Sequence, residues 1–186
     1  SGMRPLTAGE DGPLCRVFEG LSPRSRFLRY QRAAPALSIS AVRALIDLRP
    51  GFHVALAAEI DGEPMGIARW IRHRTDSEHA EIALEVIDAM QGRGIGRRLT
   101  AAAARSALDA GIECLSCWVD VEHGPLRNRL LSMGAQAAPD EPDLPGLLVV
   151  DPAGGRQDDP VPLDPDGLPD AWTPAERAHR GDVVRS

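Results

Sequence analysis

Apolar residues recur along the chain with two different periods, and these periods predict an alternation of helices and strands. Helical spacing covers residues 9–20, 23–32, 38–48, 94–110 and 125–133. Runs typical of strands cover residues 3–8, 53–60, 63–71, 78–88, 112–121 and 147–150. Because helices and strands follow one another over the first 150 residues, the pattern predicts one α/β domain.

Short polar signals mark where several of these elements begin and end. Ser22-Pro23 is typical of a helix start, with the serine as N-cap and the proline in the first turn. Asp61-Gly62 is a strong hairpin signal, so the strands on either side are expected to pair in antiparallel fashion. Gly111 is expected to end the long helix. This hairpin precedes the segment 80–110, which has the order strand, glycine-rich turn and helix.

The composition changes near the end of the chain. Nine of the sixteen prolines lie after residue 138, and no hydrophobic period continues beyond residue 152. We therefore expect a domain at 3–152 and an arm rich in proline and aspartate at 153–186. The arm is expected to lie on the domain, to lie on a second copy of the chain, or to be free. The protein is accordingly expected to be a monomer or a homodimer.

The formal net charge of −6 is unevenly distributed. Residues 139–186 hold eleven Asp or Glu against four Arg, a balance of −7, which leaves +1 for the rest. An acidic arm beside a nearly neutral body argues against nucleic acid as a partner. The sequence has neither an apolar run of membrane-spanning length nor a secretory signal, so we expect a cytoplasmic protein that binds no membrane.

The three cysteines do not suggest a disulfide framework or a metal site. Cys114 and Cys117 have the spacing of a metal-binding pair, but they lie in a predicted strand, where residues three apart point to opposite faces. No second pair completes a four-ligand site. We therefore expect core cysteines and no metal.

The most informative chemistry lies in the loop Gln91-Gly92-Arg93-Gly94-Ile95-Gly96. Its glycines let a ligand approach the backbone, and the helix start supplies unpaired N–H groups, which together suit phosphate oxygens. A nucleoside-triphosphate loop is excluded because it needs a lysine, and the chain contains none. A dinucleotide-binding fingerprint has a different glycine spacing. The remaining candidate is the coenzyme A loop, Q-x-x-G-x-G.

This loop resembles the signature of the GCN5-related N-acetyltransferase (GNAT) superfamily. Residues 20–29 look like the opening helices of its bacterial branch that includes protein acetyltransferases. Residues 80–83 resemble a strand of the protein-lysine branch, and residues 123–135 are similar to the late helix of the family. The resemblance covers about residues 3–150. It implies a mixed, largely antiparallel sheet flanked by helices, and direct transfer of an acetyl group from acetyl-CoA to a primary amine on a protein or a small molecule.

The resemblance also implies roles for particular residues. Glu81 lies where the protein-lysine branch carries its catalytic base, and Glu85 is a second candidate because strand alternation puts it on the same face. The alternative is that both carboxylates belong to a solvated face. The end of the strand, at Val86 and Ile87, is expected to bind the pantetheine arm. The pyrophosphate is expected to lie on Gln91, Gly92, Arg93, Gly94, Ile95, Gly96 and Arg97.

The general acid stays unassigned. Many relatives carry a tyrosine in the late helix, where this sequence has Leu130, and the only tyrosine, Tyr30, is distant in sequence. His123 replaces the usual asparagine before that helix and is either a catalytic candidate or a capping or surface histidine. Two further functions remain open: a non-catalytic acetyl-CoA-binding sensor or interaction module, and a structural subunit.

Arginines cluster in two further segments. Arg69, with its neighbours Arg72, His73 and Arg74, is expected to bind the 3′-phosphate of the cofactor or an acidic substrate, or to lie on a solvated hairpin end. Arg29 and the arginines at positions 24, 26 and 32 are expected to line a substrate groove or to coat a helix.

Overall fold

The computed structural model describes residues 2–30, 33–118, 136–137 and 147–150. The predicted helix at 125–133, His123, Leu130 and the arm at 153–186 lie outside the described residues, so the expectations placed on them stay predictions. Within the described part, the order of the elements follows the predicted order, and most ends differ by a few residues.

A mixed sheet forms the centre of the molecule. Its strands, in spatial order, are β1 (Gly2–Pro5), β2 (His53–Ile60), β3 (Glu63–Arg72), β4 (His79–Val86), β5 (Cys114–Trp118), β7 (Leu147–Val150) and β6 (Gln136–Ala137). Neighbouring strands are antiparallel except β4 and β5, which are parallel. The predicted α/β fold with a largely antiparallel sheet is therefore confirmed. The two-residue strand β6 was not predicted, because so short a strand has no readable period.

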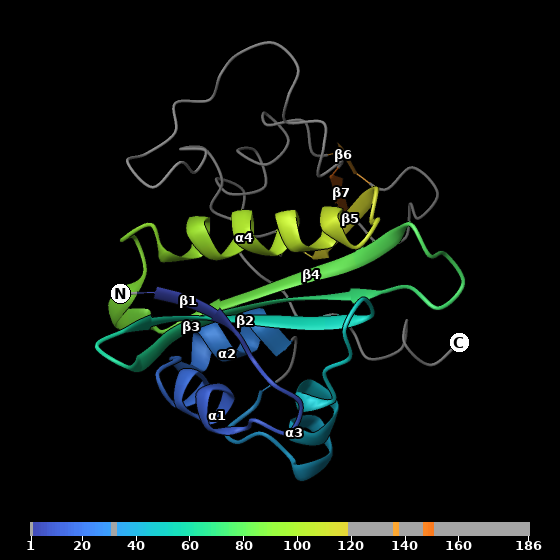
Figure 1. Cartoon of the computed structure of the whole chain (residues 1–186). Coiled ribbons are helices and arrows are strands. Elements are labelled where there is room, and N and C mark those ends of the chain that lie inside the picture. The colour runs from blue at the N-terminus through green and yellow to red at the C-terminus, as the bar shows by residue number, and fades with distance from the viewer. Residues whose placement is uncertain (1, 31–32, 119–135, 138–146, 151–186) are drawn as a thin grey trace.

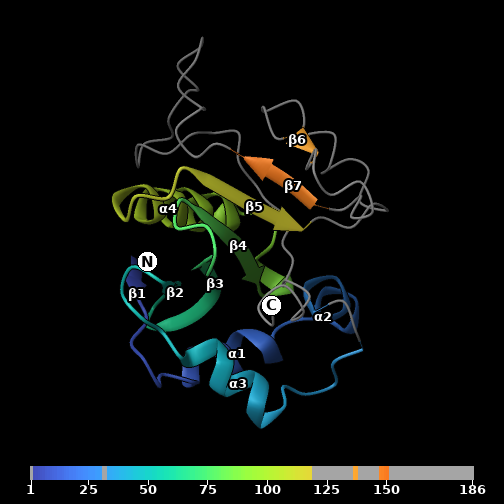
Figure 2. The same ribbon diagram turned by 90° about the vertical axis from the view of Figure 1, so that its right-hand side faces the viewer.

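Helices cover both faces of this sheet. The first three, α1 (Gly12–Glu19), α2 (Pro23–Tyr30) and α3 (Ile39–Ile46), lie on one face, and α4 (Ile95–Asp109) lies on the other (Figure 1). A short 3-10 turn, Asp88–Met90, follows β4 and leads into the loop before α4. Figure 2 shows β5 and β7 on the side of β4 away from β1. A ligand that crosses the sheet next to β4 would therefore connect the α4 side with the side of the first three helices.

Local chemistry explains several of the observed ends. Ser22 and Ser38 precede α2 and α3, and each hydroxyl accepts a hydrogen bond from the amide three residues further on, at 3.2 and 3.1 Å. Asp61 and Gly62 have φ angles of +53° and +83°, as the tightest hairpin turns require. The positions of Ser22, Asp61 and Gly62 confirm the helix-start and hairpin signals identified in the sequence.

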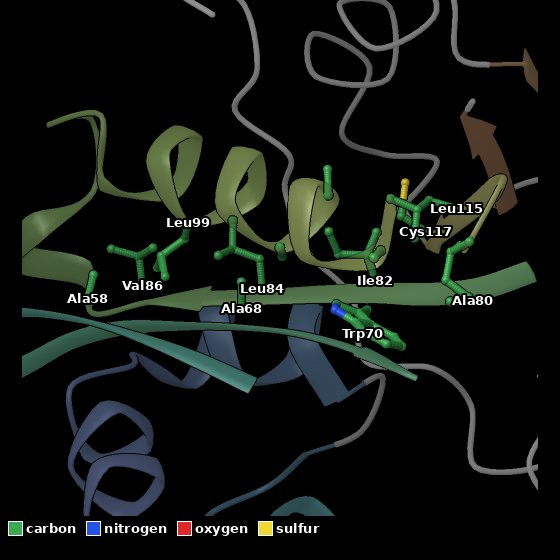
Figure 3. Close-up of a cluster of buried hydrophobic side chains, with 14 residues drawn as sticks. Ala58, Ala68, Trp70, Ala80, Ile82, Leu84, Val86, Leu99, Leu115 and Cys117 are labelled. Carbon is green, nitrogen blue, oxygen red and sulfur yellow. The ribbon is translucent and has the colours of Figure 1, made fainter. Parts of the chain in front are cut away.

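Two clusters of buried hydrophobic side chains hold the layers together. The larger one lies between α4 and the sheet and includes Leu84, Val86 and Leu99 (Figure 3). The smaller one lies on the opposite face of the sheet and includes Val17 and Ile67. Burying one large aliphatic side chain stabilises a fold by roughly 1.5–3 kcal/mol. Because β4 lies between two covered faces, its side chains are buried in both directions.

Other expectations concern single residues. Trp70 is 1% exposed, and its indole N–H donates to the Ser106 hydroxyl at 3.2 Å, so it lies in the core. Cys117 is buried and Cys114 is partly buried, and neither forms a disulfide. In the part of the chain that the structure describes, no helix is long and apolar enough to cross a membrane.

Candidate active site

The sheet opens between its two parallel strands. Residues 79–81 of β4 pair with residues 114–116 of β5, and the pairing stops there. β4 itself continues to Val86 and stays paired with β3 over that length. Among the described residues, β4 is therefore paired along both edges up to Glu81. Beyond Glu81 it is paired along one edge only, with β3. The separation begins at Ile82, ahead of Val86 and Ile87, where the pantetheine arm is expected.

The open edge of β4 directs backbone groups into this opening. The N–H of Ile87 donates to the Met65 carbonyl at 3.0 Å, on the β3 side. Successive residues of a strand direct their backbone groups to opposite edges, so the N–H groups of Leu84 and Val86 face the β5 side. The Val86 carbonyl, on the same edge, accepts a hydrogen bond from the side-chain amide of Gln91 at 3.0 Å. The opening is therefore lined by backbone donors.

The loop after β4 exposes the start of α4. Gly92 and Gly94 have φ angles of +74° and +81°, which favour glycine. An added Cβ on Gly92 would meet no atom within 4 Å, so the backbone there is open to a ligand. Gly94 is the N-cap, and the helix's first hydrogen bond joins the Arg98 N–H to its carbonyl at 3.1 Å. The amides before Arg98 have no acceptor within the helix, so they suit an anion.

The other loop residues have different surroundings. An added Cβ on Gly96 would lie 3.3 Å from the Leu84 side chain, so this glycine lets α4 approach β4 closely. Arg93 and Ile95 line a hollow of about 260 Å³ between the start of α4 and the strands β1 and β2, where Arg98 and Met90 also lie. The loop sequence thus combines backbone exposure, close packing and positive charge.

The corner between α1 and α2 is attached to the same end of β4. The Asp88 N–H donates to the Gly20 carbonyl at 3.0 Å, and the Ser22 N–H donates to the Asp88 carboxylate at 3.3 Å. The Gln91 side-chain amide reaches the same carboxylate at 3.3 Å. An added Cβ on Gly20 would lie 2.4 Å from Cγ2 of Ile87, so only glycine permits this approach. The corner between α1 and α2 and the loop before α4 are therefore both held by the short segment that contains Ile87 and Asp88.

Glu81 and Glu85 lie on the face of β4 that points away from α4. They are only 6% and 2% exposed. The alternative that both carboxylates belong to a solvated face is therefore wrong, because helices cover this side of the sheet (Figure 1). Glu81 lies opposite Ser116, at the last β4–β5 pair before the opening. The structure thus places one candidate base at the edge of the opening.

Glu85 is the centre of a buried group that also contains Arg29, Tyr30 and Arg69, called here the Glu85 cluster. Nη2 of Arg69 donates to Oε1 at 3.2 Å, and the Tyr30 hydroxyl donates to Oε2 at 2.8 Å. Nε of Arg29 lies 3.5 Å from Oε2. Arg69 also donates to the Leu45 carbonyl at 2.9 Å. Since Arg69 and Arg29 are each 3% exposed, neither lies on a solvated surface.

The surroundings shift pKa values in and beside the Glu85 cluster. Burial raises the pKa of Tyr30, and the charge of Glu85 adds to the rise, so the phenol stays protonated and donates. Burial lowers the pKa of Arg69, and Glu85 opposes this shift. Burial, helped by the positive charge of Arg69, lowers the pKa of His53 to about 4. His53 is therefore a neutral imidazole at neutral pH.

Comparison with protein families identifies the fold group to which this arrangement belongs. The sequence from residue 19 to residue 134, more than half of the chain, matches the Acetyltransferase (GNAT) family. The chain belongs to the GNAT acetyltransferase family. The matched range includes the corner between α1 and α2, the opening beside β4 and the glycine loop. The GNAT family transfers acyl groups, so the protein is an acyltransferase by family.

Several solved structures resemble the chain. The GNAT domain of S. lividans PAT is 26% identical with a TM-score of 0.72, over 80% of this chain and 89% of that chain. The N-acetyltransferase from Staphylococcus aureus Mu50 is 13% identical with a TM-score of 0.61, over 82% and 99%. The cAMP-binding acyltransferase from Mycobacterium smegmatis is 22% identical with a TM-score of 0.54 over 88% of this chain, which spans only 46% of that protein. The last two show a common fold.

Sequence reasoning missed the contacts that join distant segments. Tyr30 and Glu85 are 55 residues apart, and no local signal pairs them. Arg29 is one of several arginines in its helix, and the sequence does not distinguish it from the others. Asp88 carries no motif of its own, although it joins the helix corner to the loop. His123, the third catalytic candidate, lies outside the described residues.

Proposed function

We propose that this GNAT-family protein is an acetyl-CoA-dependent N-acetyltransferase that moves the acetyl group directly to a primary amine. The observation that carries the proposal is the opening of the sheet beside Leu84 and Val86, next to the exposed start of α4. A long ligand with a pyrophosphate and a thioester fits this arrangement. The amides at the start of α4 suit phosphate oxygens, and the amides of the open β4 edge, just before them in the sequence, suit a thioester carbonyl.

The residues of the loop and of β4 divide the binding of acetyl-CoA between them. The backbone of Gly92 and Gly94 and the first turn of α4 would hold the pyrophosphate, with Arg97 adding positive charge. Gln91 keeps the loop against β4 through its bond to the Val86 carbonyl. Acetyl-CoA supplies an activated acetyl group. The N–H groups of the open β4 edge would donate to its thioester carbonyl and its pantetheine arm.

Glu81 is the proposed general base. An ammonium group must lose a proton before its nitrogen can attack, and Glu81 accepts that proton directly or through water. The nitrogen then forms a bond to the acetyl carbon and the carbon–sulfur bond breaks. The nitrogen gives up its second proton to solvent, and the thiolate leaves and takes up a proton from solvent. A thiolate is a good leaving group because its conjugate thiol has a pKa of roughly 8.5. Glu85 fits this role less well, because Tyr30 and Arg69 already occupy its oxygens.

Calorimetry with coenzyme A tests the loop. Gly94→Val is expected to abolish binding, because a β-branched side chain is strained at a φ of +81° and obstructs the backbone. Gly111→Val is the matched control, since Gly111 has a φ of +80°, an open Cβ position and a place at the far end of α4. Both variants lose stability, but only Gly94→Val loses affinity. Tight binding by Gly94→Val, or an equal loss in both variants, contradicts the assignment.

Release of free thiol from acetyl-CoA across a panel of primary amines tests the base. Glu81→Gln is expected to lower kcat by roughly 10²–10⁴ and to leave the affinity for coenzyme A nearly unchanged. The exposed Glu78 provides a matched control in Glu78→Gln, which should keep full activity. An unchanged kcat at every pH removes Glu81 from this role. Coenzyme A binding without turnover of any amine would instead support the non-catalytic alternative.

A further inference from the structure

The Glu85 cluster contains more positive than negative charge. Arg29 and Arg69 contribute two positive charges, Glu85 contributes one negative charge, and Tyr30 is neutral, which leaves a balance of +1. The three charged side chains are almost completely shielded from water, and a buried charge is stable only when an opposite charge or hydrogen bonds compensate it. Among the residues that the structure describes, this cluster is therefore one negative charge short of balance.

Both arginines have buried nitrogens that make no hydrogen bond, Nε of Arg69 and both Nε and Nη1 of Arg29, so Arg29 lacks more partners. Arg69 has two partners, the Glu85 carboxylate and the Leu45 carbonyl. Arg29 approaches Glu85 at 3.5 Å, and neither its Nε nor its Nη1 makes a hydrogen bond, although both atoms are buried. The oxygen that it approaches already accepts the Tyr30 hydroxyl at 2.8 Å. A guanidinium has five N–H donors suited to a carboxylate, so Arg29 has donors to offer to a second one.

The position of Arg29 relates these donors to the proposed reaction. Arg29 lies in the last turn of α2, and the next residue, Tyr30, is bonded to Glu85, the neighbour of Val86. This helix lies on the face of the sheet toward which Glu81 and Glu85 point. The phosphates of acetyl-CoA are assigned to the α4 face, so an acceptor amine that reaches Glu81 approaches from the α2 face. Arg29 is therefore on the side of the acceptor.

We propose that Arg29 binds a carboxylate of the acceptor, so that the substrate of this enzyme is an amine that also carries a carboxylate. The proposal rests on the proposed function, since it assigns the acceptor of the same site. The carboxylate accepts hydrogen bonds from the Arg29 donors and neutralises the excess charge, while the amine reaches Glu81. The same chemistry occurs in a free amino acid and in a peptide whose reactive lysine has an acidic neighbour.

Matched acceptor pairs test the preference. The first pair is 4-aminobutanoate and 4-aminobutanamide, and the second is a short peptide with lysine beside aspartate and the same peptide with asparagine. A hydrogen-bonded ion pair of this kind corresponds to a ratio in kcat/KM of about tenfold or more in favour of the carboxylate. A ratio confined to the first pair identifies a free amino acid as the source, and a ratio confined to the second identifies an acidic peptide.

Variants of α2 assign the preference to Arg29. In Arg29→Gln the ratio is expected to fall to about one through a higher KM for the carboxylate acceptor. Arg24→Gln, an exposed position of the same helix, should keep the full ratio. If Arg29→Gln does not fold, Arg29→Lys replaces it in the test. This variant should lose most of the kcat/KM ratio between the acceptors, because lysine lacks the planar donors of arginine. No preference in the parent protein, or a preference that survives these variants, overturns the proposal.

A binding measurement separates this proposal from the proposed function. Calorimetry with glutarate in the presence of coenzyme A should show binding that Arg29→Gln abolishes. If amines are acetylated without a carboxylate preference, the Arg29 proposal fails while the acetyltransferase stands. If no amine is acetylated but glutarate binds through Arg29, the anion site stands and the proposed catalysis fails. Absence of both transfer and Arg29-dependent glutarate binding overturns the anion site as well.

Discussion

Replacing Glu85 by glutamine would remove the only carboxylate of the Glu85 cluster while nearly keeping its shape. Arg29 and Arg69 would then be two buried guanidinium groups that have lost the carboxylate with which they form ion pairs among the described residues. Removing one partner of a buried ion pair typically costs about 3–5 kcal/mol. Because two cations depend on this carboxylate, we expect Glu85→Gln to cost about 4 kcal/mol or more. This is a large part of the roughly 5–15 kcal/mol that stabilises a domain.

Urea unfolding measures this cost. Trp70 is 1% exposed, so the change in its environment on unfolding contributes to a fluorescence signal. A domain of this size loses roughly 2–4 °C in Tm for each kcal/mol, so the variant should also melt about 8–16 °C lower. The urea dependence of the free energy must be the same in both proteins for the comparison to hold.

A double variant tests whether charge is the cause. Adding Arg29→Gln to Glu85→Gln removes one of the uncompensated cations, so the double variant should be more stable than the sum of the two single changes predicts. Coupling of residues in one network is typically about 0.5–3 kcal/mol. A cost below about 1 kcal/mol for Glu85→Gln, or strictly additive effects, would refute the buried-charge reasoning and leave the cluster as simple packing.

Two further changes test the packing beside the site. Gly20→Ala should lower the free energy of unfolding by about 1–3 kcal/mol, because its Cβ would lie 2.4 Å from Ile87. Gly12→Ala, whose Cβ would meet no atom within 4 Å, should change the free energy of unfolding by less than about 0.5 kcal/mol. Thermal unfolding compares the two variants. The pKa of His53 falls from 6.5 to about 4 on folding, so as the pH falls through 6.5 the unfolded state binds a proton that the folded state does not. This contribution to stability is complete above pH 6.5 and decreases by up to about 3 kcal/mol toward pH 4. In His53→Gln the urea midpoint should depend less on pH over this range than in the parent protein. The same pH dependence of the midpoint in both proteins would contradict the linkage.

Most elements of the fold could be predicted because their signals are local. Asp61-Gly62 needs only two positive φ angles to fix a hairpin, and Ser22 and Ser38 cap helices through amides three residues away. The loop before α4 is equally local, since Gly92 and Gly94 have the left-handed angles that their residue type favours. A reader of the sequence therefore finds the loop and its neighbours without knowing the tertiary structure.

The Glu85 cluster could not be predicted for the opposite reason. Strand alternation shows that Glu81 and Glu85 share a face, but it does not show what covers that face. The cover comes from α2, which brings Tyr30 and Arg29 to a strand more than 50 residues away in sequence. Arg69 reaches the same carboxylate from the neighbouring strand, two residues beyond the position opposite Glu85. Buried charge therefore appears only when the packing of helix on sheet is known.

The geometry of β4 also explains how one strand can serve both substrates. Its even positions, Leu84 and Val86, pack against Leu99 and fix the start of α4, while its odd positions carry the two carboxylates to the opposite face. A strand rises about 3.3 Å per residue, so Glu81 lies about 10 Å along β4 from the Leu84 N–H. Because the side chain of Glu81 stands roughly perpendicular to the sheet, it bridges little of that length, and the gap is wide enough for an amine together with one water. Proton removal through water therefore fits the spacing of the proposed base and the proposed carbonyl donors better than direct contact.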